Sequence, residues 1–265
     1  PNTGYFAGGR TTPALSTVER IDYSNDTATA SVRGQLNTAQ LFAAATGNSS
    51  FGYHGGGGPY NAQKSSVDRI DYLNDTATAV AKGPLSVARI GLSATGNANF
   101  GYFASGAYPT PITTVDRIDY SNDSATASAK GPLSVARSHL AATGNASFGY
   151  FGGGNNVSSG AYSSTVDRVD YSNDTGTAPA KGPLSGAKKY FAATSSRANA
   201  IPTENIVNYA AGTYGTPNTG YFAGGRTPGY ASSIDRIDYS NDTAIALSKG
   251  QLTQSKKVGG GVSSD

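Results

Sequence analysis

The chain has 265 residues, of which 37% are hydrophobic and 10% aromatic, enough to build one packed domain. It contains no cysteine, which excludes disulfides, thiolate metal sites and a cysteine nucleophile. Its net charge of +3 is small and no apolar run is long enough to cross a membrane, so we expect neither specific nucleic-acid binding nor membrane insertion.

In chain order, one complete repeat predicts four short strands separated by turn residues. Val67–Tyr72 alternates β-branched and polar residues, and a Leu-Asn-Asp turn separates it from the Thr-rich strand Thr76–Ala81. A Lys-Gly-Pro sequence then breaks the chain before a strand expected over Leu85–Thr95. After a Gly-Asn turn, Phe100–Ala104 is the fourth strand. Four short strands joined by Gly-rich turns are typical of one propeller blade.

The motif of the first of these strands, VDRIDY with small variations, occurs five times. Consecutive copies lie about 50 residues apart, except for one longer interval. The anchor residues of the five copies are Tyr23, Tyr72, Tyr120, Tyr171 and Tyr239. A second motif, GYFAGG and its variants, alternates with the first and begins at Gly4, Gly52, Gly101, Gly149 and Gly220. This repeat length predicts an all-β propeller of four-stranded blades.

The order of the motifs resembles that of kelch repeats. One strand of the repeat carries Arg89 or Arg137, with Lys188 and Lys256 as cognates and Gln40 as a departure. An aromatic strand then ends in a glycine pair, although no copy has the Trp that usually closes a kelch repeat. The resemblance implies a propeller that acts by binding. The wording of the repeats is also similar to that of marine bacteriophage structural proteins, which implies a place in a virion.

Five copies of each motif predict a single domain over residues 1–265, a propeller of five blades. The C-terminal sequence QLTQSKKVGGGVSSD matches an innermost strand, so we expect the N- and C-terminal strands to share one blade and close the ring. The longer interval predicts an irregular insertion or half-blade at about residues 195–216. Within it, Glu204–Tyr209 echoes the main motif, so a degenerate sixth blade is the alternative.

The acidic residues favour a structural role over catalysis. Each copy contributes three acids, as Asp68, Asp71 and Asp75 do, and five such sets make 15 of the 17 acids. Because no acid is set apart for acid–base chemistry, we expect no enzyme, no catalytic residue and no cofactor. Blades stack face to face, so we expect Asp68-type acids to pair with Arg69-type bases of the neighbouring blade. The Asn-Asp turns are interpreted as Asx turns in preference to sugar or calcium sites.

The two histidines do not indicate a metal site. His54 stands where other copies have Phe, which predicts a place in or near the core. His139 occupies a position held elsewhere by Phe42, Gly91 and Tyr190. Since the two histidines belong to different strand types, we expect no bound metal.

The connections predict two ends of different chemistry. In a four-stranded meander, the loops from the second to the third strand share one end with the blade-to-blade links. These loops vary most between copies, and variable loops on a rigid scaffold are where binding usually occurs. The candidate binding residues are their tyrosines and the bases of the links: Tyr60, Tyr108, Tyr162, Tyr230, Arg33, Lys82, Lys130, Lys181 and Lys249. The opposite end is expected to collect the turn acids Asp26, Asp75, Asp123, Asp174 and Asp242.

These observations predict a non-enzymatic structural or binding propeller. The expected partners are other protein subunits of an assembly, or a glycan or polyanionic surface, met in a virion or at an extracellular surface. A kelch-type adaptor that recruits a protein partner is the alternative. The bland interpretation of the candidate face is that its tyrosines pack locally and its lysines are merely solvated.

Overall fold

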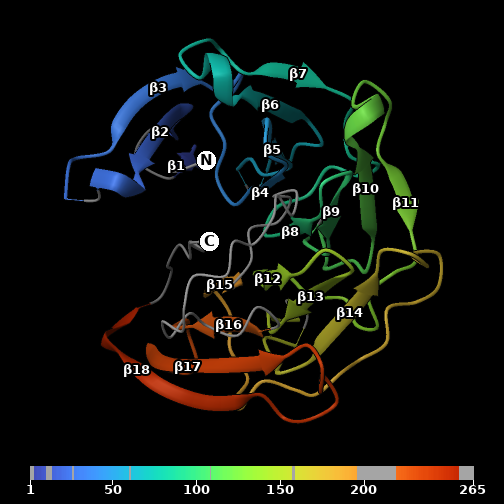
Figure 1. Cartoon of the computed structure of the whole chain (residues 1–265). Coiled ribbons are helices and arrows are strands. Elements are labelled where there is room, and N and C mark those ends of the chain that lie inside the picture. Colours follow the sequence, from blue (N-terminus) through green and yellow to red (C-terminus); the bar gives the residue numbers. More distant parts are fainter. Residues whose placement is uncertain are drawn as a thin grey trace, which may run out of the picture.

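The computed structural model describes residues 3–9, 14–25, 27–59, 61–107, 109–156, 159–195 and 219–256. Five antiparallel sheets stand around a common centre as the blades of a propeller (Figure 1). Regular structure in these ranges consists of strands and three short 3-10 turns, η1 (Tyr23–Asn25), η2 (Tyr72–Asn74) and η3 (Tyr120–Asn122). The predicted all-β propeller with five blades is confirmed. The predicted insertion lies outside the described residues except for residue 195.

The strands follow the chain from the first sheet to the fifth. The first sheet contains β1 (Thr3–Ala7), β2 (Thr17–Asp22) and β3 (Ser31–Gln35). The second contains β4 (Ala44–Gly47), β5 (Phe51–Gly55), β6 (Val67–Asp71) and β7 (Val80–Lys82). The third contains β8 (Ser93–Gly96), β9 (Phe100–Ala104), β10 (Val115–Asp119) and β11 (Ser128–Lys130). The fourth contains β12 (Ala141–Gly144), β13 (Phe148–Gly152) and β14 (Val166–Asp170). The fifth contains β15 (Ala192–Ser195), β16 (Thr219–Ala223), β17 (Ala231–Asp238) and β18 (Leu247–Lys256).

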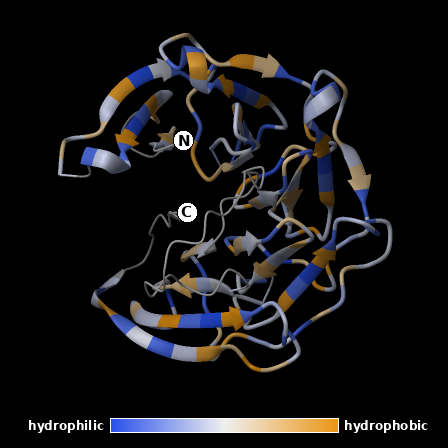
Figure 2. Cartoon of the chain, viewed as in Figure 1, coloured by the Kyte–Doolittle hydropathy of each residue, from blue (hydrophilic) through white to orange (hydrophobic). Residues whose placement is uncertain are grey.

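Neighbouring sheets pack on each other through side chains from both faces of the strands. Hydrophobic and hydrophilic residues alternate along strands such as β10 and β14 (Figure 2). The core between the third and fourth sheets includes Tyr102, Val115, Phe151 and Tyr171, and the rings of Tyr102 and Tyr171 stack with centroids 4.6 Å apart. Similar clusters join the other consecutive pairs of sheets. Burial of this apolar surface between sheets is the main force that holds the propeller together.

The predicted strand Leu85–Thr95 is only partly a strand, because its first half links two sheets. Only Ser93–Gly96 forms β8. The link begins at Gly83, whose amide donates to the carbonyl of Asp123 in the next sheet, 2.9 Å away. A Cβ at Gly83 would lie 1.8 Å from the carbonyl oxygen of Ala125. A side chain cannot fit in this contact, so the link requires glycine.

The C-terminal strand does not take its predicted place. The residues Gln251–Lys256, expected in an innermost strand beside β1, continue β18 and pair with β17. In the described chain, β1 pairs only with β2. In sheets two to four, the equivalent segment leaves the edge and packs against the turn of the next sheet, whereas no described sheet receives the segment of the fifth. Residues 257–265 lie outside the described residues. In Figure 1, the first and fifth sheets stand on either side of an opening in the ring.

Candidate functional site

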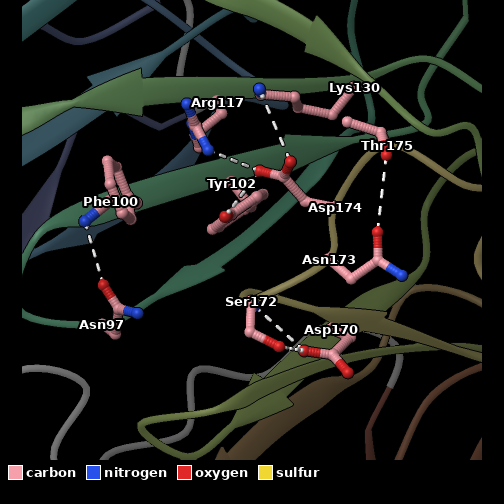
Figure 3. Close-up of polar contacts among 10 residues, drawn as sticks. All are labelled: Asn97, Phe100, Tyr102, Arg117, Lys130, Asp170, Ser172, Asn173, Asp174 and Thr175. Atoms are coloured by element: carbon pink, nitrogen blue, oxygen red, sulfur yellow. Dashed lines mark hydrogen bonds and ion pairs between the residues drawn. The ribbon is translucent and has the colours of Figure 1, made fainter.

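Four of the five bases predicted to line a free rim instead bind acids between the sheets. Each donor sheet presents a tyrosine, an arginine and a lysine to a turn aspartate of the next sheet, and we call this group the carboxylate clamp. In the clamp of Figure 3, Tyr102 Oη lies 2.9 Å, Arg117 Nη1 2.8 Å and Lys130 Nζ 3.5 Å from carboxylate oxygens of Asp174. Lys82, Lys181 and Arg33 occupy the same place in the other clamps.

Four of the five turn acids, expected to make the opposite end acidic, are therefore buried in the sheet interfaces, and Asp26 lies outside the described residues. The acceptors of the four clamps are Asp75, Asp123, Asp174 and Asp242. Burial raises the pKa of Asp123, but hydrogen bonds from Lys82, Tyr53 and Arg69 outweigh it and leave this pKa below its usual value. Burial and the bond to Asp123 raise the pKa of Tyr53. The acid thus stays charged and the phenol protonated at neutral pH.

The predicted pairing between Asp68-type acids and Arg69-type bases is wrong in its partners. Asp116, the cognate of Asp68 in the third sheet, accepts from Arg89 of the preceding link at 2.8 Å and from Ser86. Both ionic side chains are fully buried, and Arg89 also donates to the carbonyl of Phe103. Arg137–Asp167 and Lys188–Asp235 repeat the pair. Besides the carboxylate clamp, an ion pair excluded from solvent, which we call the dry ion pair, therefore holds each of these links to a strand of the next sheet.

The second aspartate of the VDRIDY motif fixes the geometry of the turn that follows it. Asp71 caps η2 by accepting the amide of Leu73, and Asp119 does the same for Ser121 in η3. The Asn residues of the Gly-Asn turns behave alike, since Asn48 accepts the amides of Ser50 and Phe51. The Asx turns were predicted at the Asn-Asp sequences, where the Asn side chain instead accepts from a hydroxyl two residues on, as Asn173 Oδ1 does from Thr175 Oγ1 at 3.4 Å.

The links meet around the centre of the propeller through a chain of backbone hydrogen bonds. Gly91 donates to Phe42, His139 to Gly91 and Tyr190 to His139, over 2.8, 2.7 and 3.1 Å. All four residues have positive φ, between 53° and 65°. Left-handed backbone in bulky residues is uncommon and costs on the order of 1–3 kcal/mol, and it concentrates at functional sites. Glycine, as at Gly91, adopts this backbone conformation without strain. Phe42, His139 and Tyr190 adopt it at a cost in backbone free energy.

The cations of this region lie beside tyrosines. The ammonium of Lys189 stands 5.0 Å from the ring centroid of Tyr162 and 5.1 Å from that of Tyr190, within cation–π range. Lys189 and Arg226 exchange both backbone hydrogen bonds, at 3.0 and 2.7 Å, so their side chains begin on neighbouring segments. Arg226 in turn forms a β-bridge with Tyr230, which is 63% exposed. The guanidinium of Arg226 has no ion pair in the described part of the chain.

His139 adds neutral polar atoms to the same region. Its Nδ1 lies 3.0 Å from Ser138 Oγ and 3.4 Å from Asn155 Oδ1, and its ring centroid lies 4.3 Å from that of Tyr190. Burial lowers the pKa of His139 to about 4, and the charge of Lys189 acts in the same direction. The buried Nε2 has no hydrogen-bond partner among the residues that the structure describes. We call Tyr162, Lys189, Tyr190, Arg226 and Tyr230, with His139 and Asn155, the loop-face cluster.

The structure brings together only part of the predicted binding face. Tyr162 and Tyr230 belong to the loop-face cluster, whereas Tyr60 and Tyr108 lie outside the described residues. Lys249 is exposed and forms no ion pair within the described ranges. The predicted place of His54 in the core is confirmed: it is buried, and its Nδ1 lies 3.0 Å from Gln40 Oε1.

Sequence reasoning missed Lys189, Tyr190 and Arg226 as possible binding residues. The signal was present as a break in the repeat: the pair Ile90-Gly91 of one link becomes Lys189-Tyr190 in another. Arg226 likewise follows a glycine pair at a position where the third repeat has Ala107. Comparing repeats within the chain position by position would have identified all three.

Comparison with known proteins identifies the fold. No family model matches the sequence, and a search of curated proteins finds no match. The solved structure of YjhT, a kelch-like β-propeller, superposes with a TM-score of 0.74 at 12% sequence identity. The chain has a kelch-type propeller fold. The alignment covers 98% of this chain and 84% of YjhT.

Two further features bear on the class of protein. No helix within the described ranges is long and apolar enough to span a membrane. The described residues also contain no group of three or more His, Asp or Glu side chains placed to hold a metal ion.

Proposed function

We propose that this protein is a non-enzymatic binding propeller whose loop-face cluster receives acidic groups of a glycan or polyanionic surface. The observation that carries the proposal is the placement of Lys189 and Arg226 on adjoining backbone segments, among three tyrosines. Tyrosine supplies contact area and a hydroxyl at low entropic cost, and charge-assisted bonds to carboxylate or sulfate are stronger than neutral ones.

The acids support a role without catalysis. Aspartates of the described chain serve ion pairs, clamps and turns, as Asp116, Asp123 and Asp119 illustrate. Glu19 is exposed and stands apart from the loop-face cluster. Within the ranges that the structure describes, the side chains hydrogen-bonded to His139 are those of Ser138 and Asn155, and neither is a carboxylate that could act with it as a general acid or base.

The proposed setting is a virion or an extracellular assembly, where the protein serves attachment or decoration. This setting rests on the resemblance in wording between the repeats and marine bacteriophage structural proteins that the sequence alone suggests. Detection of the protein in purified particles by mass spectrometry is the expected result. Its presence only in the cytosol of host cells would favour the adaptor role, to which the exposed Tyr230 is also suited.

Binding to a sulfated glycan such as heparin is expected to depend on the cluster. The double variant Lys189→Ala/Arg226→Ala should bind at least tenfold more weakly at physiological salt, because each charge-assisted contact contributes about 1.5–3 kcal/mol. Biolayer interferometry on immobilised heparin measures this effect. The variant Arg236→Ala/Lys249→Ala removes the same two positive charges elsewhere and serves as the matched control. Equal weakening by both variants would reduce the binding to net charge and contradict a site at the cluster.

A further inference from the structure

The fifth sheet has a clamp-donor face that nothing covers in the described structure. We call Tyr221, Arg236, Lys249 and Gly250 the end face, because they are the cognates of Tyr102, Arg117, Lys130 and Gly131. In the first four sheets these donors bind an aspartate of the following sheet. Among the described residues, the side chains of Tyr221, Arg236 and Lys249 form no hydrogen bond or ion pair, although their backbones belong to the strands of the fifth sheet. Three donors of one clamp are thus present without their acceptor.

The space around the link glycines also distinguishes the covered sheets from the uncovered fifth sheet. A Cβ at Gly131 would lie 1.8 Å from the carbonyl oxygen of Gly176, and a Cβ at Gly182 would lie 1.6 Å from that of Ala244. At Gly250, a Cβ would meet nothing within 4 Å. The fifth repeat therefore has a glycine at a position where only a following sheet would require one.

Apolar residues of the end face are also less covered than their cognates. Leu133 and Val115 are 1% and 0% exposed because the fourth sheet covers them. Their cognates Leu252 and Ile234 are only half-buried. The clamp donors, the glycine and the half-buried apolar residues of this surface are those of an internal sheet interface from which the following sheet is missing.

The first sheet shows the complementary surface on the other side of the opening (Figure 1). Glu19 is exposed, although its cognate Asp116 is fully buried against the preceding link. Ile21 is half-buried, although its cognate Ile118 is 3% exposed. In the described chain, the first sheet also contains no innermost strand. The uncovered face of the first sheet is therefore the one that, in an internal sheet, packs against the preceding sheet.

We propose that the opening is a docking site for one further sheet of this same repeat. Every internal sheet carries an aspartate turn on one face and the tyrosine, arginine and lysine on the other, so a single sheet satisfies both ends. Its aspartate would complete the clamp of Tyr221, Arg236 and Lys249, and its own link would reach Glu19. The charges are complementary, and the contacts continue four interfaces already present. A single sheet is the occupant because both uncovered faces border the same opening.

The experiment supplies such a sheet by appending a second copy of Asn97–Gly144 after Asp265. This stretch contributes one turn, three strands, one link and one innermost strand, which matches what the opening lacks. The thermal unfolding midpoint of the extended chain is expected to exceed that of the original by roughly 5 °C or more. An extension carrying Asp123→Asn in the appended copy should lose most of this gain, because its clamp has no charged acceptor.

Gly250→Ala separates docking from a general effect of the added residues. It should leave the midpoint of the original chain unchanged and abolish the gain in the extended chain. Gly182→Ala, the matched control inside an existing interface, should lower the midpoint of both. Equal damage by Gly250→Ala and Gly182→Ala in the original chain would show that its own first sheet or a second copy already covers the end face, and this overturns the proposal. An extended chain that folds without any gain overturns it as well.

Thiol labelling keeps the proposal testable if the extended chain does not fold. The protein has no cysteine, so a single introduced thiol reports on its own position. In the original chain, Lys249→Cys should react with a maleimide at least tenfold faster than Lys130→Cys, because only Lys130 is covered by a following sheet. Equal, slow labelling at both positions would show a covered end face and contradict the proposal.

Discussion

Replacing Asp116 with alanine is expected to lower the free energy of unfolding by about 3–5 kcal/mol. The substitution leaves the guanidinium of Arg89 fully buried without its counter-charge. It also removes the acceptor of Ser86, which ties the link to β10. The desolvated cation then has only carbonyl acceptors, among them that of Phe103. Urea unfolding followed by circular dichroism measures the loss.

Asp119 provides the matched control, because it lies on the same strand and caps a turn in contact with solvent. Asp119→Ala should cost about 1 kcal/mol, the usual contribution of a capping side chain. If Asp116→Ala proved no more damaging than Asp119→Ala, the dry ion pair would not hold the link to the sheet. Replacing both Arg89 and Asp116 by apolar residues of similar volume should cost less than Asp116→Ala alone, since no charge is then left buried.

Acidification from pH 7 to pH 5 is expected to destabilise the protein through its buried histidine. Burial lowers the pKa of His54 to about 4, from an ordinary value of 6.5. Between pH 6.5 and pH 4, His54 therefore binds a proton in the unfolded chain but not in the folded chain. Stability is complete above pH 6.5 and falls as the pH decreases toward 4. The contribution of this one residue between pH 7 and pH 5 is about 2 kcal/mol.

His54→Phe restores the aromatic residue of the sibling repeats and should remove this part of the pH dependence. The measurement is the difference between the unfolding free energies at pH 7 and pH 5, so the lost hydrogen bond to Gln40 cancels. Lys249→Ala, an exposed change, should leave the difference as in the original chain. A pH difference that His54→Phe does not reduce would mean that His54 accepts a proton in the folded protein.

The sequence was sufficient to predict two of the strands whose residues repeat, whereas the Thr-rich strand expected at Thr76–Ala81 forms only at Val80–Lys82. The motif around Val67–Asp71 and the aromatic strand Phe100–Ala104 lie where their alternation and β-branched residues placed them. The link from Leu85 was expected to continue as a strand, because its apolar residues look like those of one. They are apolar because they pack between two sheets, and a single repeat seen alone does not show that environment.

The candidate binding residues divide in the same way. Tyr162 and Tyr230 were predicted from loop variability, and they lie in the loop-face cluster. Lys82 and Lys130 were predicted to face a partner, but the partner is an aspartate of the neighbouring sheet. A lysine that repeats in every blade binds something that also repeats in every blade. Lys189 and Arg226 are the cations that the structure places beside tyrosines of the variable loops.

By itself, the sequence determined the architecture of this protein, since a period of about 50 residues with four strand signals admits little other than a propeller blade. It also determined that His54 is buried, because a sibling Phe holds its place. Only the tertiary structure decided which acid meets which base, because pairing depends on how far one sheet is rotated against the next. It alone placed β18 along β17 and left the end face uncovered, because a strand leaves its sheet only where a following sheet receives it.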